Sequence, residues 1–332
     1  MLSIGHIKVD SSLVLAPMAG ISDLPFRMIN RSFGCGLAFT EMISAKSLIN
    51  NSKKTLRMIS PTPDDRPLGL QILGYDPETI KRAMDFVSKY PFDLIDFNAA
   101  CPVNKVVSKV EGAGLLREPA KLQGLLEIIV QNTSLPVTVK IRSGWDETSV
   151  NAVEIALRAQ DAGVSALFIH GRTRMQGYSG TVDYNVIRHV KSSIGIPVIA
   201  NGDALTPGLI ERMFSETGCD GVAIARGALG NPWIFRETSA YLLDGTIPCS
   251  PGVCEVANIM RKHLCMLVEY HGEKTAVILF RKFFSWYTRG MAVKELKRSA
   301  FHAESPGGML QLIDNVKNSR ATLRALTDVS TV

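Results

Sequence analysis

The sequence predicts an α/β protein: a (β/α)8 TIM barrel followed by a C-terminal all-helical domain. Eight short apolar runs recur at fairly regular intervals through the first 225 residues, and helical patterns separate most of them. After residue 235 this alternation stops and only helical patterns follow. Non-alternating apolar strands separated by helices are typical of a parallel sheet covered by helices, and eight such units indicate a closed barrel.

The eight predicted strands are rich in Val, Ile, Leu and Phe. They cover residues 13–16, 38–41, 68–72, 94–98, 137–140, 166–170, 198–201 and 221–225. The clearest helical patterns between them cover residues 77–89, 119–131, 150–162 and 207–217. An open doubly wound sheet would usually have fewer units and a GxGxxG fingerprint after its first strand, which this sequence lacks. The closed barrel is therefore the better prediction.

The domain boundary is predicted from a change of composition. Residues 236–251 carry Gly245, Pro248 and Pro251 and are expected to form a linker or turn. From residue 253 to about 326, apolar residues recur at three- and four-residue spacing without strand alternation. We therefore predict a barrel domain over residues 1–240 and a helical domain over residues 252–327.

Composition points to a cytoplasmic protein with a large core. The 332 residues are 46% hydrophobic and 20% charged, a composition that can bury a large core and argues against global disorder. No apolar run reaches the roughly 18–20 residues of a membrane span, and the N-terminus shows no export signal. The six cysteines form no CxxC pair, as expected of reduced thiols. Nothing in the sequence indicates an obligate protein partner, so a monomer is expected.

The net charge of +6 is concentrated near the C-terminus. Residues 252–327 hold twelve Lys and Arg against six Asp and Glu, so the rest of the chain is about neutral. A basic segment on a neutral body indicates an anionic partner such as nucleic acid. A solvated basic helical face explains the charge alone equally well.

Polar residues stand at the ends of seven of the eight predicted strands, within one residue of the predicted strand end. They are Glu41, Gln71, Asn98, Lys140, His170, Asn201 and Arg226. The carboxyl ends of the strands form the active face of such a barrel. As core residues, each of these side chains would need a buried partner. As a set, they predict a ligand site.

The last two barrel loops predict a phosphate-bearing cofactor. Residues 200–206 and 225–232 follow the seventh and eighth strands, and each loop presents a glycine close to the strand end. Backbone N–H groups approach a ligand closely at glycine, and these two loops commonly hold phosphate in barrels. Arg226 would add charge and a rigid fork of donors.

The polar set suits a flavin ring. Lys140 would stabilise negative charge on a reduced flavin, and Gln71 and Asn201 would both donate and accept at its pyrimidine edge. Alternatively, Lys140 forms a structural ion pair with Asp96 or Glu41. His170 would then be a satisfied core histidine, although its setting in "FIHGRTR" favours a functional role.

Cys101 lies in "DFNAACPVNKV", directly after a predicted strand and before Pro102. A thiol with a pKa of about 8.5 is mostly protonated at neutral pH and serves as an acid as well as a nucleophile. A nucleophile would need an adjacent imidazole base, and His170 lies two strands away. The acid role is therefore favoured over the nucleophile, and an inert buried cysteine is the alternative.

Seven motifs, in order along the barrel, resemble those of the tRNA-dihydrouridine synthase family. They are "LAPMAGISDLPFR", "TEMISA", "DFNAACPVNKV", "VTVKIRSGWD", "FIHGRTRMQGYSG", "PVIANGDALT" and "DGVAIARGALGNPWIF". The later "FRKFFSWYTRG" is similar to the basic, aromatic segment of the family's helical domain, especially in its bacterial B-type branch.

This resemblance implies an FMN enzyme that uses NADPH to reduce the C5–C6 bond of a uridine in tRNA. Cys101 matches the proton donor to uracil C5, and the hydride would pass from flavin N5 to C6. The implied cofactor contacts are Pro17, Met18, Ala19, Gln71, Lys140, His170, Asn201, Gly202, Asp203, Ala225, Arg226 and Gly227. Asn98 and Arg172 match positions near the target uracil, and no metal is implied. Which uridine is reduced is not implied.

One residue departs from the family pattern. Glycine usually precedes the catalytic cysteine, whereas this chain has Ala100. If the backbone there requires a positive φ, alanine costs about 1 kcal/mol or somewhat more. A slightly altered loop is then expected.

The basic C-terminal segment is expected to hold tRNA beside the barrel mouth. Its charges and stacking faces are Arg281, Lys282, Trp286, Tyr287 and Arg289. The alternative for Trp286 and Tyr287 is packing between the helix and the barrel.

Two other functions fit parts of the sequence. An FMN barrel acting on a free pyrimidine, such as a dihydroorotate dehydrogenase, would leave the basic helical domain unexplained. A non-catalytic RNA-binding barrel would bind no flavin. A metal site at Cys249, Cys254 and Cys265, with His263 and His271, matches no short zinc spacing and is not expected.

Overall fold

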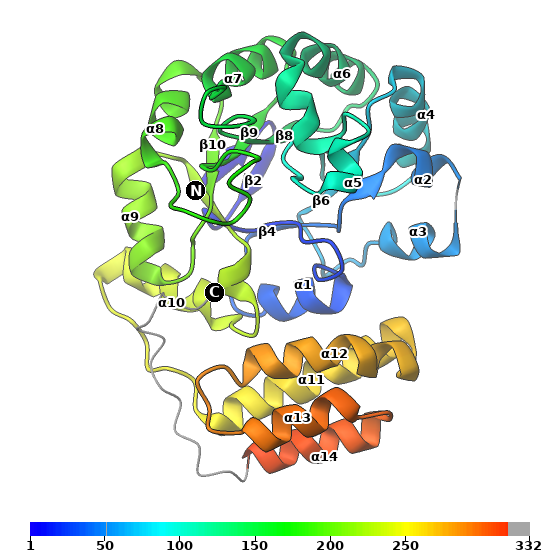
Figure 1. Ribbon diagram of the computed structural model, residues 1–332, viewed down its shortest axis with the longest axis vertical. Coiled ribbons are helices and arrows are strands. Elements are labelled where there is room, and N and C mark those ends of the chain that lie inside the picture. The colour runs from blue at the N-terminus through cyan, green and yellow to red at the C-terminus, as the bar shows by residue number, and fades with distance from the viewer. Residues whose placement is uncertain (51, 318–332) are drawn as a thin grey trace.

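Eight parallel strands close into a barrel in the computed structural model, which describes residues 1–50 and 52–317 (Figure 1). The strands are β3 (Leu13–Leu15), β4 (Leu37–Phe39), β6 (Leu68–Leu73), β7 (Leu94–Asn98), β8 (Val137–Arg142), β9 (Ala166–His170), β10 (Val198–Asn201) and β11 (Gly221–Ile224). Each pairs in parallel with its neighbours, and the β4–β6 and β3–β11 pairings close the ring. The predicted barrel is confirmed. A two-residue strand, β5 (Ile43–Ser44), pairs with β6.

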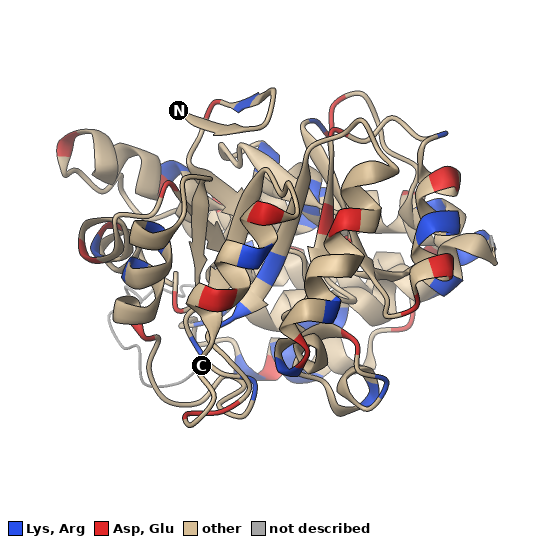
Figure 2. Ribbon diagram, turned by 90° about the horizontal axis from the view of Figure 1, so that it is seen from above, with Lys and Arg blue, Asp and Glu red and all other residues tan. Residues whose placement is uncertain are grey.

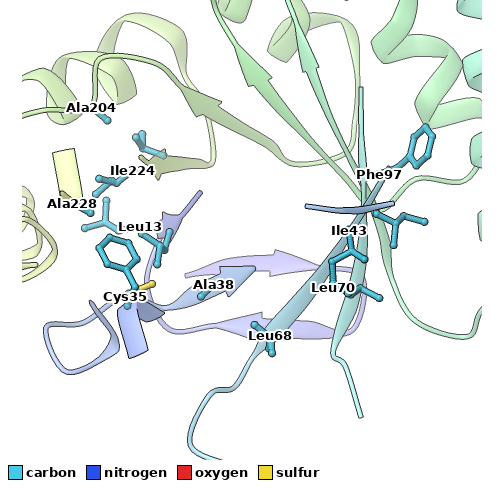
Figure 3. Packing of buried hydrophobic residues seen from close by; sticks show 14 of the residues in the cluster. Leu13, Cys35, Ala38, Ile43, Leu68, Leu70, Phe97, Ala204, Ile224 and Ala228 are labelled. Atoms are coloured by element: carbon cyan, nitrogen blue, oxygen red, sulfur yellow. The ribbon is translucent and has the colours of Figure 1, made fainter. Parts of the chain in front are cut away.

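Successive side chains along each strand point to opposite faces of the sheet, and this alternation divides the core into a layer inside the barrel and a layer between the sheet and the helices. In β6, Leu68, Leu70 and Ile72 pack in the outer layer between sheet and helices, part of which Figure 3 shows. Gly69 and Gln71 take the alternate, inward positions. A Cβ at Gly69 would lie 2.4 Å from the Phe39 ring, so glycine there makes room for that ring inside the barrel.

Helices cover the outside of the barrel in the order of the chain. The larger ones are α1 (Leu24–Arg31), α4 (Pro77–Val87), α6 (Pro119–Gln131), α7 (Ala152–Asp161), α8 (Tyr184–Ser193), α9 (Pro207–Thr217) and α10 (Trp233–Asp244). The shorter ones are α2 (Ala45–Ile49), α3 (Lys53–Met58), α5 (Asn104–Val107) and the 3₁₀ turns Gly112–Arg117 and Arg226–Ala228. Polar caps start several of them; Asp76, for example, accepts from the Thr79 N–H, with Pro77 in the first turn.

An N-terminal hairpin, which we did not predict from the sequence, closes the amino-terminal end of the barrel. Its antiparallel strands are β1 (Leu2–Ile4) and β2 (Ile7–Val9). Leu2, Ile4 and Val9 pack in one buried cluster with the inward-facing Phe39 and Phe168. Strands of three residues are too short to show a periodicity in the sequence. The hairpin makes this end of the barrel apolar, which leaves the opposite end for a polar site.

The predicted linker over residues 236–251 is wrong in its first part. Helix α10 continues to Asp244 because Trp233, Ile234 and Phe235 anchor it in the core. Gly245, in the left-handed region with φ 77°, ends it. The connection is therefore only residues 245–252.

Four helices form the described part of the C-terminal domain, which the sequence predicted to be all-helical. They are α11 (Val253–His271), α12 (Glu273–Tyr287), α13 (Lys294–His302) and α14 (Pro306–Lys317); the predicted residues 318–327 lie outside the described residues. The domain lies beside α1 (Figure 1), and Phe26 of α1 stacks on Phe283 of α12. In the described part of the chain, no helix is long and apolar enough to cross a membrane.

Candidate functional site

A cavity of about 400 Å³ opens where the barrel strands end at their carboxyl side. This volume lies in the range of about 300–1,000 Å³ that is usual for ligand sites. Thirteen of the predicted site residues line it: Pro17, Met18, Ala19, Gln71, Asn98, Cys101, Lys140, His170, Asn201, Gly202, Asp203, Ala225 and Arg226. Arg172, Gly227 and the five residues proposed in the helical domain are not among its lining residues.

The loop that carries Cys101 is fixed by the side chain of Asn98. Asn98 Oδ1 accepts the backbone N–H groups of Ala100 at 3.0 Å and Cys101 at 2.9 Å. The Cys101 carbonyl accepts the Ala113 N–H at 3.0 Å. Gly112 lies directly against this loop, since a Cβ there would be 2.9 Å from the Cys101 oxygen. Cys101 is half-buried, and burial raises the pKa of its thiol against the opposing effects of a Val103 backbone hydrogen bond and Arg142. The thiol is therefore held in its protonated form at neutral pH.

Ala100 causes no backbone strain. Among the described residues other than glycine, only Val110 and Asp203 have a positive φ. Ala100 is therefore outside the left-handed region, and the cost considered for a replaced glycine does not arise. Its N–H bonds to Asn98, and its carbonyl accepts from Arg142 Nε at 2.8 Å.

Arg142 is a site residue that we did not single out in the sequence. It is 2% exposed, lines the cavity and gives its donors to three backbone carbonyls: Ala100, Thr173 and Gly177. Burial lowers its pKa to about 10. The signal was present, because Arg142 follows Lys140 by two residues on the same strand and so shares its inward face. This buried cation joins the Cys101 loop to the loop after β9.

Lys140 of β8 forms a hydrogen bond with Asn201 of β10 and not the ion pair with Asp96 or Glu41 that was the alternative. Its Nζ donates to Asn201 Oδ1 at 2.9 Å, and Asn201 Nδ2 donates to the Ala223 carbonyl at 2.6 Å. Burial lowers the pKa of Lys140 to about 8, and the nearby Asp96 opposes this shift. Burial likewise raises the pKa of Asp96 to about 6, which its hydrogen bonds with Gln71 and Thr138 oppose. Lys140 thus presents an ammonium with neutral partners to the cavity.

His170 is not a satisfied core histidine. It is 6% exposed, and its Nε2 has no hydrogen-bond partner among the residues that the structure describes. Burial, followed by the charges of Arg142 and Lys140, lowers its pKa well below the usual value, so the ring is neutral. Gly202 permits this position, because a Cβ there would lie 2.9 Å from the His170 ring. A buried polar atom without a partner at a cavity wall is expected to bind a ligand.

Asp203 ties two arginines together at the rim. Its carboxylate accepts from Arg172 at 3.0 and 2.6 Å and from Arg226 at 2.9 Å. Its backbone is in the left-handed region with φ 47°. Arg172 also donates to the Ser179 and Gly180 carbonyls, so its guanidinium is used within the protein. The two arginines and one carboxylate leave one net positive charge beside the loops predicted to hold phosphate.

Most of the predicted tRNA-binding residues make contacts within the protein, either to the barrel or inside the helical domain. Lys282 Nζ donates to the Gly20 carbonyl, and the Gly20 N–H donates to the Glu41 carboxylate. Arg281 donates to the Ala303 carbonyl, within the helical domain, at 2.8 Å. Tyr287 is 3% exposed, so its ring has no face open for a base in this structure. Trp286 is partly buried against the core, and Arg289 is half-exposed.

Fold and site together define a (β/α)8 barrel enzyme with a cofactor-sized cavity, in whose wall several polar side chains lie, at the carboxyl ends of its strands. Two solved structures share the fold. They are histamine dehydrogenase from Rhizobium sp. 4-9 (TM-score 0.58, 12% identity, 97% of this chain and 64% of that one) and 6-hydroxypseudooxynicotine amine oxidase from Pseudomonas geniculata N1 (TM-score 0.54, 14% identity, 79% and 52%).

Residues 14–322 match the dihydrouridine synthase (Dus) family, and the chain belongs to this family. It is 38% identical to tRNA-dihydrouridine synthase B of Pseudomonas aeruginosa, over 86% of both chains, and 40% identical to that of Pseudomonas syringae pv. tomato, over 86% and 84%. A probable tRNA-dihydrouridine synthase of Rickettsia conorii is 36% identical over 88% of both chains. The resemblance to the B-type branch is confirmed, and with it the expectation of a flavin-dependent oxidoreductase.

The residues of the cavity fit a flavin. The unpartnered Nε2 of His170 is available to a polar ring edge, and Lys140 provides a cation next to neutral amides. Gly202, with φ 122°, leaves the cavity wall free of a side chain beside His170. These features match a ring system with hydrogen-bonding groups on one edge.

Proposed function

We propose that this protein reduces the C5–C6 bond of a uridine in tRNA, with FMN as its bound cofactor, NADPH as reductant and Cys101 as proton donor. The observation that carries the proposal is a half-buried thiol, held protonated, at the wall of the cofactor-sized cavity. FMN, when bound, would supply the hydride to C6 from its N5. Family membership and the names of the relatives support the substrate.

The chain's own residues have separate tasks in this reaction. Asn98 holds the Cys101 loop so that Sγ can deliver its proton to C5. Lys140 and the neutral His170 would bind the polar edge of the flavin, and Gln71 with Asn201 would complete it. The loops at Gly202 and Arg226 would hold its phosphate, as the last two loops of such barrels commonly do. A general acid contributes typically about 10²–10⁴-fold to a rate.

The substrate must leave its stack to reach this site. A uridine at the bottom of a barrel mouth has to be turned out of the folded tRNA, which costs a few kcal/mol of stacking. The helical domain is suited to offset this cost, because residues 252–317 hold ten Lys and Arg against six Asp and Glu. We propose that the domain orients the tRNA and so selects the uridine. A cytoplasmic location and a monomeric state remain predictions.

The test uses tRNA from cells that lack this protein. The purified protein is expected to be yellow, with a flavin absorbance spectrum, and to form dihydrouridine in that tRNA when NADPH is added. Mapping the product by mass spectrometry would identify the uridine. A colourless protein that binds RNA would contradict the proposal in favour of a non-catalytic barrel. Oxidation of free dihydroorotate without any change in tRNA would favour the free-pyrimidine dehydrogenase.

A further inference from the structure

Asp96 is a buried carboxylate beneath the site, and the mechanism above gives it no task. It faces inward on β7, where it is in register with Gln71 of β6 and Thr138 of β8. It is 1% exposed, yet both of its oxygens are used. Oδ1 accepts from Thr138 Oγ1 at 2.7 Å, and Oδ2 accepts from Gln71 Nε2 at 2.6 Å. An ionised carboxylate is an acceptor only, so it fixes which way both partners point.

A chain of hydrogen bonds leads from Asp96 to the cysteine loop. Because the amide nitrogen of Gln71 faces Asp96, its Oε1 is left to accept Nδ2 of Asn98 at 2.9 Å. Asn98 therefore presents its Oδ1 to the loop, where it accepts the N–H groups of Ala100 and Cys101. Every donor in the chain points towards Asp96.

The polarity of this chain depends on the groups at both of its ends. Gln71 and Asn98 are primary amides, so in the absence of those end groups either side of each amide could face its neighbour. If the Asn98 amide were turned, its NH₂ would face the two loop N–H groups. All of these groups are donors, so the two hydrogen bonds to the loop would be lost. The loop N–H groups require Oδ1 of Asn98 at their end of the chain. At the buried end, the carboxylate of Asp96 has no proton to offer, so it fixes Gln71 and keeps Oε1 of Gln71 available to Nδ2 of Asn98. Thr138 in turn satisfies the second oxygen of that carboxylate.

We propose that Asp96, supported by Thr138, is a positioning residue: it fixes the amide orientations of Gln71 and Asn98 and thereby holds Cys101 in place for proton transfer. This inference rests on the proposed function for the role of the thiol. The positioning itself concerns the loop alone and is testable without any substrate.

Three substitutions separate positioning from simple packing. Asp96→Leu keeps the branched shape and removes both acceptors. Asp96→Asn keeps an acceptor for Gln71, and its NH₂ can face Thr138, whose hydroxyl rotates to accept it. Asp96→Asn combined with Thr138→Val removes that acceptor, so the new amide has no reason to keep its orientation. Thr217→Val is the matched control, because it removes a 2% exposed threonine hydroxyl with its hydrogen bonds to Met213 and Cys219, outside the lining of the cavity.

The main measurement is the rate at which iodoacetamide alkylates Cys101 in the flavin-loaded protein, read by peptide mass spectrometry. The exposed Cys254 and Cys265 serve as references within the same molecule. Asp96→Leu and the double variant are expected to alkylate Cys101 about tenfold faster than the wild type, because the loop is released around a half-buried thiol. Asp96→Asn and Thr217→Val are expected to stay within about threefold of the wild type.

Turnover of tRNA is the second measurement. A misplaced acid is expected to lower kcat about 100-fold in Asp96→Leu with a much smaller change in KM, and Asp96→Asn is expected to recover most of that loss. Unchanged Cys101 alkylation in Asp96→Leu would overturn the inference. If that variant does not fold, the alkylation rate of Cys101 in the double variant is compared with the rate in Asp96→Asn. Equal rates in these two proteins would likewise overturn the inference. If the wild type reduces no tRNA, the proposed function fails, while the alkylation comparison still decides whether Asp96 holds the loop.

Discussion

At the scale of single residues, the site combines a protonated thiol with cationic side chains whose positions are fixed by hydrogen bonds. The Cys101 thiol is kept protonated by burial, and Arg142, Lys140 and Arg172 are each fixed by acceptors within the protein. Arginine and lysine side chains with fixed positions need no reorganisation when a charged ligand arrives. The protein's own acceptors therefore hold these cations in place.

The acid role of Cys101 predicts the direction of the pH dependence. Its pKa is raised by burial, so the proton is present at neutral pH and is lost only above the ordinary thiol value of about 8.5. We expect kcat for dihydrouridine formation to fall as the pH rises beyond that value. A rate that instead increases through pH 8–9, as the thiolate forms, would indicate a nucleophile. Measuring kcat from pH 6 to pH 10 with saturating tRNA decides between the two.

Arg142 is expected to be needed for the geometry of two loops. Arg142→Met would leave the carbonyls of Ala100, Thr173 and Gly177 without donors, at a cost of about 2–4 kcal/mol in the free energy of unfolding. Dihydrouridine formation should fall with it, because the Cys101 loop is one of the two. Urea unfolding and turnover of the same preparation test this. Wild-type stability in the variant would show that these contacts carry no weight.

At the scale of elements, the barrel and α12 meet at Gly230. A Cβ at this position would lie 2.3 Å from the Trp286 carbonyl carbon and 2.4 Å from the Tyr287 nitrogen, and its φ is 67°. Gly230→Ala should therefore cost about 1–2 kcal/mol of backbone strain plus about 1–3 kcal/mol for the clash. Gly218→Ala is the matched control, with φ 68° and open space around it. Equal losses of unfolding free energy in the two variants would contradict this close contact.

His263 makes the contact between the domains sensitive to acid. It is fully buried among Phe26, Phe280 and Phe283, and its Nδ1 lies 3.1 Å from the Tyr287 hydroxyl. Burial lowers its pKa to about 4. The stability that depends on the neutral ring is therefore complete above about pH 6.5 and is lost as the pH falls towards 4.

The consequence is measurable as a difference between two proteins. Between pH 7 and pH 5, the wild type should lose about 2 kcal/mol more unfolding free energy than His263→Leu, which has no group to titrate there. Urea unfolding at the two pH values provides the comparison. An equal loss in both proteins would assign the pH dependence to other groups.

Prediction from the sequence succeeded where a pattern repeats and failed where a feature occurs once. Eight apolar strands with polar ends gave the barrel and its active face, because each unit repeats the same alternation of sheet and helix. The N-terminal hairpin occurs once and is very short, and the linker was misjudged because Gly245 and its neighbouring prolines lie just after a helix end. The sequence contains Arg142 and Asp96 at positions that belong to a predicted strand or lie just past the end of one, but it does not show their contacts. Their contacts depend on strand register, which the sequence does not display.

At the scale of the whole molecule, the two domains share the loop that lines the cavity. The Gly20 peptide is held by Glu41 of the barrel on one side and Lys282 of α12 on the other. Acidic and basic residues are interspersed over the face of the barrel that Figure 2 shows. Lys282, predicted as a tRNA contact, joins the helical domain to the wall of the site.

Arg289 and Lys297 are the better candidates for contacts to tRNA phosphates. Burial and then the charge of Arg289 lower the pKa of Lys297, and no side-chain hydrogen bond or ion pair of either residue is found within the described residues. Changing both to Gln should raise KM for tRNA several-fold, with little change in kcat, and reduce its dependence on salt. Lys81→Gln on α4, which lies away from the helical domain in Figure 1, is the control. An unchanged KM would remove these two residues from the interface.

The most direct test of the central claim compares Cys101→Ala with the wild type in two half-reactions. Flavin content and flavin reduction by NADPH are expected to stay within about twofold, because the thiol is proposed to act only on the uracil. Dihydrouridine formation in tRNA is expected to fall at least about 100-fold, since the general acid is lost. Dihydrouridine formation at the wild-type rate in Cys101→Ala would contradict the account.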